Sequence, residues 1–111
     1  MPLTFNEYQE RARETAFYPD IGNNIGYPAL GLCGEAGEVA EKVKKVYRDS
    51  GGVLDSTTIA AIRKELGDVL WYLANLAYEI GAPLDTIARE NLAKLQDRAA
   101  RGKMSGSGDQ R

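Results

Sequence analysis

Two segments of the chain carry the same unusual pattern: an acid, one residue, a glycine, a second acid and a valine. The pattern reads EAGEV at residues 35–39 and ELGDV at residues 65–69. Both segments have apolar residues at helical spacing, and a separation of three places the two acids of each pair on one helical face. A glycine inside a helix costs about 1 kcal/mol relative to alanine. The repeated pattern therefore constrains both the fold and the chemistry of this chain.

Start and stop signals predict four helices. Thr4 followed by Glu7 forms a capping box, the Gly-Gly pair at residues 51–52 ends a long helical segment, and Gly81 ends another. The expected helices span residues 4–17, 28–48, 56–80 and 83–102. No useful run of strand-like alternation interrupts them. We expect an all-α, four-helix bundle-like protomer, with a domain over residues 1–102 and a flexible C-terminal tail over residues 103–111 that could close over a site.

The second and third expected helices should form an antiparallel hairpin that turns at residues 51–52. Counted outward from this turn, Glu38 lies level with Glu65, and Glu35 lies level with Asp68. Four carboxylates would then gather, with each glycine letting the facing backbone approach. Clustered carboxylates repel one another and either take up protons or bind cations. An oxygen-only ligand set suits Mg²⁺, with Mn²⁺ as a substitute.

The composition excludes several other chemistries. The chain has no histidine, which removes imidazole catalysis, the usual zinc sites and the Glu-x-x-His pairs of di-iron bundles. Cys33 is the only cysteine, so neither an internal disulfide nor a cysteine zinc cluster can form. The net charge of −2 argues neither for nor against nucleic acid, and we expect no nucleic-acid polymer as partner. No apolar run is long enough for a membrane. We expect a cytoplasmic protein.

The third expected helix is apolar on more than one face, and such a helix must be covered on more than one face. Because four short helices can hardly cover it, we expect a homodimer or homotetramer. The interpretation of Glu41 is different, since the lysines at positions 42, 44 and 45 surround it. We interpret Glu41 as part of a solvated helix face.

The segments GLCGEAGEVAEKVKK and ELGDVLWYLANLA resemble the MazG-like all-α nucleotide pyrophosphohydrolases, relatives of dimeric dUTPases and of dCTP pyrophosphatase. The family signature is E-x-x-E on one helix and E-x-x-D on the next. Here the matching residues are Glu35, Glu38, Glu65 and Asp68. The resemblance covers about residues 8–111. In one departure, Gly34 stands where many relatives carry another glutamate.

The resemblance implies an enzyme that hydrolyses a nucleoside triphosphate, with deoxynucleotides favoured, to the monophosphate and pyrophosphate in nucleotide-pool sanitation. It also implies that the four acids hold Mg²⁺. One acid that is not fully committed to the metal could activate the attacking water, and Glu35 and Glu38 are both candidates. No covalent enzyme intermediate is needed.

Cationic and aromatic side chains complete the expected site. Asn91 and Lys94 share a helical face and match an N-x-x-K feature of the relatives, and basic residues continue into the tail. Tyr72 lies four residues after Asp68, on the metal-facing side. Trp71, Tyr18 and Tyr27 are the other candidates for stacking on the base. The amides of Asn23, Asn24, Asn75 and Gln9 could read the base through hydrogen bonds. The expected substrate-binding residues are Trp71, Tyr72, Asn91, Lys94, Lys103 and Arg111.

An alternative function from another class is a non-catalytic helical oligomer that binds nucleotide or a protein partner. It agrees with the small size of the chain and its apolar third helix. It leaves the four aligned acids unexplained, so the hydrolase is the favoured interpretation.

Overall fold

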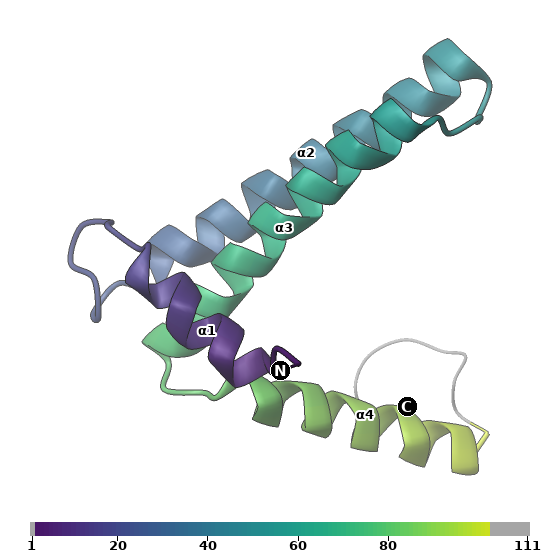
Figure 1. The fold of residues 1–111 in the computed structure, drawn as a ribbon. Coiled ribbons are helices and arrows are strands. Elements are labelled where there is room, and N and C mark those ends of the chain that lie inside the picture. The colour runs from purple at the N-terminus through teal and green to yellow at the C-terminus, as the bar shows by residue number, and fades with distance from the viewer. Residues whose placement is uncertain (1, 103–111) are drawn as a thin grey trace.

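A computed structural model describes residues 2–102, and all regular structure within them is helical (Figure 1). The helices are α1 (Phe5–Glu14), α2 (Gly26–Ser50), α3 (Ser56–Glu79) and α4 (Leu84–Ala100). The predicted all-α class with four helices is confirmed. None of these helices combines the length and the apolar character that crossing a membrane requires.

The expected capping signals operate at the helix ends. The Thr4 hydroxyl accepts a hydrogen bond from the Glu7 N–H at 3.0 Å, and the Asp55 carboxylate accepts one from the Thr58 N–H at 2.7 Å. Both satisfy backbone donors that the first turn of a helix leaves open. At the other end of α2, Gly51 takes a left-handed conformation with φ of 59°. This left-handed conformation ends the helix and lets the chain reverse. Few residues other than glycine adopt it readily.

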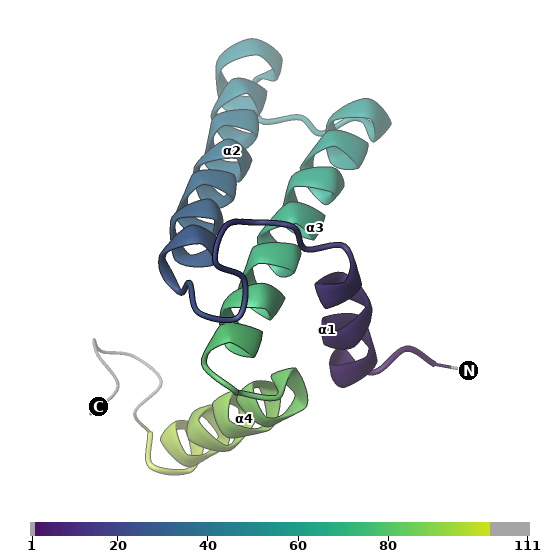
Figure 2. The ribbon, with the colours of Figure 1, turned by 90° about the vertical axis from the view of Figure 1, so that its left-hand side faces the viewer.

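The long helices α2 and α3 form the expected antiparallel hairpin (Figures 1 and 2). The short helix α1 lies beside α3, and α4 leaves the end of α3 and contacts α1 and α3. Among the helices of residues 2–102, α2 contacts only α3. The tip of the hairpin therefore projects away from α1 and α4, as both views show.

The hydrophobic core lies where α1, α3 and α4 meet. It is built from small residues and one leucine: Ala12, Ala74, Ala77 and Leu84. The buried side chain of Gln9 joins the three helices, since its amide donates to the carbonyl oxygens of Ala74 and Ala82 and accepts from the N–H of Leu84. The amide groups of Gln9 are thus committed to the fold, and the expectation that Gln9 reads a base is wrong.

Large apolar side chains remain exposed on the hairpin. Leu30 is 75% exposed, Leu66 51% and Ile59 44%. The radius of gyration is 16.8 Å, whereas a compact domain of this length has about 13 Å. A single chain thus leaves the outer faces of the hairpin uncovered.

Candidate metal centre

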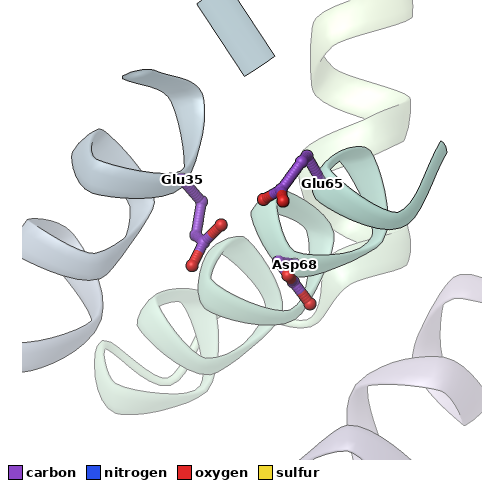
Figure 3. Close-up of side chains that lie close together, drawn as sticks. All are labelled: Glu35, Glu65 and Asp68. Carbon is purple, nitrogen blue, oxygen red and sulfur yellow. The ribbon is translucent and has the colours of Figure 1, made fainter. Parts of the chain in front are cut away.

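Three carboxylates meet where α2 faces the middle of α3 (Figure 3). Glu35 comes from α2, and Glu65 and Asp68 come from one face of α3. Each offers an oxygen, and these oxygens all lie within 4.8 Å of one another. Glu35 and Glu65 are half-buried, whereas Asp68 is exposed. The structure therefore brings together three of the four acids in the family signature.

The proximity of these acids changes the ionisation of Glu35. A hydrogen bond with Glu65 raises the pKa of Glu35, and burial and the negative charges of Asp68, Glu65 and Glu38 raise it further. Neighbouring acids that favour a proton on Glu35 in this way would also favour a bound cation. The donors are all carboxylate oxygens and one of them is exposed, which fits a hard divalent ion with room for water or phosphate oxygens. The residues thus fit Mg²⁺ or Mn²⁺.

Glu38 stands beside this cluster. Its side chain is exposed, it is outside the set of three mutually close acids, and its charge still acts on Glu35. The role of Glu38 as a fourth ligand or as the base stays a prediction.

The glycines in and before the repeated pattern have different surroundings. A Cβ on Gly31 would lie only 2.1 Å from the ring of Tyr72, so Gly31 does allow close approach. A Cβ on Gly34, Gly37 or Gly67 would meet no atom within 4 Å. The expectation that each glycine admits the facing helix is therefore wrong for these three positions within one chain. They line an open surface.

The three lysines of α2 separate into two groups. Lys44 and Lys45 lie 3.0 and 3.8 Å from the carboxylate oxygens of Glu41, which confirms that Glu41 belongs to a solvated face. The ammonium of Lys42 points across the hairpin and lies 3.8 Å from an oxygen of Glu65. Lys42 thus touches the metal centre, although the sequence interpretation grouped it with its neighbours. Its position seven residues after Glu35, two helical turns along the same face, was the missed signal.

Tyr72 lies on the side of the acids away from Lys42. Its ring covers Gly31, and burial, together with the neighbouring Tyr27 and Glu35, raises its pKa. The Tyr27 and Tyr72 ring centroids are 6.4 Å apart, and Tyr27 stacks on Tyr18 at 4.8 Å. A row of aromatic rings therefore ends at the metal centre.

Trp71 faces the other side of α3, toward α1. Its indole N–H donates to the Thr15 hydroxyl at 2.8 Å, and it lines a cavity of about 490 Å³ with Tyr8 and Arg11. Burial and the charge of Asp68 raise the pKa of Tyr8, so the exposed acid of the cluster acts electrostatically on one residue of this cavity.

A buried carboxylate at the end of α3, which sequence analysis missed, holds the loop of residues 15–25. The Glu79 side chain accepts hydrogen bonds from the N–H groups of Gly22 and Asn24, each at 2.8 Å, and from the Tyr18 hydroxyl at 2.5 Å. It also forms an ion pair with Arg13 at 2.8 Å. Burial alone would raise the pKa of Glu79, but these hydrogen bonds lower it to about 2. Glu79 thus fixes the loop that places Tyr18 under Tyr27.

The amide of Asn75 is used inside the protein. It is 1% exposed, its oxygen accepts from Arg13 at 3.2 Å, and its nitrogen donates to the Trp71 carbonyl at 3.0 Å. The expectation that Asn75 reads a base is wrong for the same reason as for Gln9.

The expected phosphate-binding residues do not join the acids within one chain. Asn91 and Lys94 line a hollow on α4 with Ile87 and Glu90, and α4 contacts α1 and α3 only. Lys103, Arg111 and the predicted tail lie outside the described residues. The roles of these residues stay predictions.

Comparisons with known proteins agree with the geometry. Residues 28–102 match the family model of the MazG nucleotide pyrophosphohydrolase domain, and this range contains the three clustered acids and Glu38. The Gene 37 protein of Mycobacterium phage L5 is 46% identical over 109 residues, which cover 94% of this chain and 96% of that protein. No solved structure shows a significant match. With a family match over most of its length and the acids in place, this chain belongs to the MazG nucleotide pyrophosphohydrolase family.

Proposed function

We propose that this protein hydrolyses nucleoside triphosphates, with deoxynucleotides favoured, to the monophosphate and pyrophosphate with Mg²⁺, and that it serves in nucleotide-pool sanitation. The observation that carries the proposal is the group of three carboxylates from α2 and α3, with oxygens within 4.8 Å of one another. Membership of the MazG family supports the same chemistry.

In this proposal, Glu35, Glu65 and Asp68 hold the metal ion. A bound Mg²⁺ would neutralise phosphate oxygens and polarise the α-phosphorus. Glu38 then serves either as a fourth ligand or as the base that accepts a proton from the attacking water, and Glu35 is the second candidate for that base. The exposure of Glu38 beside Glu35 supports both roles, because water reaches its carboxylate and its charge acts on the cluster.

Tyr72 and Trp71 are proposed to contact the nucleoside, with Tyr72 nearer to the acids. Asn91 and Lys94 sit on α4, away from the acids of their own chain, so their proposed phosphate contacts require a second copy. A homo-oligomer also agrees with the exposed apolar side chains of the hairpin, such as Leu30 and Leu66. Sedimentation should therefore give the mass of a dimer or tetramer.

Pyrophosphate release from a panel of all canonical dNTPs and NTPs tests the activity. We expect turnover with Mg²⁺, none with EDTA, and a loss of at least about 100-fold in kcat for Glu38→Gln if this residue is the base. If Glu38 is instead a metal ligand, Glu38→Gln should raise the Mg²⁺ concentration that is needed for the half-maximal rate. Glu41→Gln is the matched control on the same helix and should keep wild-type turnover.

The absence of Mg²⁺-dependent pyrophosphate release from every nucleotide in the panel would contradict the proposal. Binding of a nucleotide without turnover would favour the non-catalytic oligomer.

A further inference from the structure

A cavity of about 530 Å³ lies between α2 and α3, beyond the acids and toward the tip of the hairpin. Its charged lining is Lys42 of α2 with Lys64 and Glu65 of α3, and its hydroxyl groups come from Ser56 and Thr57. Glu65 is also one of the three clustered acids. The cavity and the candidate metal centre therefore share a wall.

Lys42 connects the two features. Its ammonium is 3.8 Å from the Glu65 carboxylate, and the two side chains are 34% and 19% exposed. A divalent cation among the acids would compete for Glu65 and repel the ammonium. Lys42 would then be available to pair with an anionic group bound in the cavity that it lines.

Lys64 adds a second cation to the lining of the cavity. Within residues 2–102 it forms no ion pair, and Glu41 is already paired with Lys44 and Lys45. The Asp55 carboxylate is occupied by the Thr58 N–H. The remaining lining consists of hydroxyl donors and two alanines whose short side chains leave room. Such a lining suits a polyanion rather than a base or a sugar.

The order of features along the hairpin gives the direction of the ligand. On α2, Gly31 with the Tyr72 ring above it comes first, Glu35 follows, and Lys42 comes last. The acids thus lie between an aromatic ring and a cationic cavity. A nucleoside triphosphate has the same order of base, α-phosphate and terminal phosphates.

We infer that this cavity binds the β- and γ-phosphates of the substrate and the pyrophosphate that they become. The inference rests on the proposed function. Attack of water on the α-phosphorus forms one P–O bond and breaks the bond to the β-phosphate oxygen, and the electron pair leaves with pyrophosphate. The water proton passes to Glu38 or Glu35. The ammonium groups of Lys42 and Lys64 stabilise the negative charge that develops on the leaving group.

Calorimetric titration of inorganic pyrophosphate into the protein with Mg²⁺ tests the inference without turnover. We expect Lys42→Met and Lys64→Met each to weaken binding at least about 10-fold, and Lys42→Arg to retain most of it. Lys44→Met, on the outer face of α2, is the control and should bind like the wild type. Binding of a deoxynucleoside monophosphate should be unchanged in all four variants, and thermal unfolding confirms that each is folded.

Two results would overturn the inference: no pyrophosphate binding by the wild type, or equal binding by the wild type and both methionine variants. Failure of the proposed function has a different signature. Lysine-dependent binding of pyrophosphate without hydrolysis of any nucleotide would refute the hydrolase and keep the cavity as a polyphosphate site. Hydrolysis of a nucleotide, together with pyrophosphate binding that is equal in the wild type and both methionine variants, would keep the hydrolase and refute the polyphosphate site.

Discussion

Glu79 offers a quantitative test of how the loop of residues 15–25 is held. Its buried carboxylate accepts four hydrogen bonds, three of them at one oxygen and the fourth, from the Asn24 N–H, at the other. In Glu79→Gln, the amide oxygen can keep the first three, but its NH₂ group then faces the Asn24 N–H. The variant loses one hydrogen bond outright and leaves the Arg13 guanidinium without its counter-charge.

The magnitude follows from these contacts. A hydrogen bond to a charged group contributes about 1.5–3 kcal/mol, and leaving a partly buried charge without its partner costs about 3–5 kcal/mol. Because Arg13 keeps some solvent contact and its neighbour Tyr18, we expect a loss of about 3 kcal/mol in the free energy of unfolding. At about 4 °C per kcal/mol, the melting temperature should fall by about 12 °C. Glu41→Gln, on an exposed face, should leave the melting temperature almost unchanged.

The effect should depend on pH in a defined window. The pKa of Glu79 is lowered from 4.5 to about 2, so its charge stabilises the fold fully above pH 4.5 and this contribution is lost as the pH falls toward 2. The difference between wild type and Glu79→Gln should therefore shrink over this window, while other carboxylates affect both proteins alike. Urea unfolding at fixed protein concentration from pH 6 to pH 2.5 measures it. If the stability difference between wild type and Glu79→Gln stays constant with pH, the charge of Glu79 is not the source of the stabilisation.

Two further predictions concern packing on α2 and α3. Gly31→Ala places a Cβ against the Tyr72 ring and should lower the free energy of unfolding by about 1–3 kcal/mol. Gly34→Ala has open space and should raise the free energy of unfolding by up to about 1 kcal/mol. Equal effects of the two variants in urea unfolding would contradict the register of α2 against α3. Trp71→Phe removes the hydrogen bond to Thr15 and should cost about 1 kcal/mol, and the double variant with Thr15→Val should cost less than the two single changes added together.

The helices and most of the metal centre could be predicted from the sequence because their signals are local. Capping residues such as Thr4 and Asp55 act within one helical turn, and the Gly-Gly turn sets the register of the hairpin. Once that register is known, spacing alone brings Glu35 near Asp68. Simple counting places residues along the helices, but it does not give side-chain directions, which is why Glu38 was expected inside the cluster.

The contacts between distant segments could not be predicted in this way. Glu79 meets its partners only because the loop of residues 15–25 folds back over the end of α3, and no spacing rule describes a loop. A signal was present, since an acid in the last turn of a helix opposes the helix dipole and needs compensation. Gln9 is similar, because a polar side chain in a short amphipathic helix has a structural role only once the partners of that helix are known.

The hairpin also determines where this chain can change its length. Residues 52–54, at the far tip, connect two helices without holding a side chain of the metal centre, so a peptide inserted there only enlarges a loop, at about 0.6 kcal/mol per doubling. One residue inserted in α2 between Glu35 and the turn would instead rotate Glu35 by about 100° away from Glu65 and Asp68. The tip is therefore the position for an inserted tag, and the two helices that lead to it must keep their lengths.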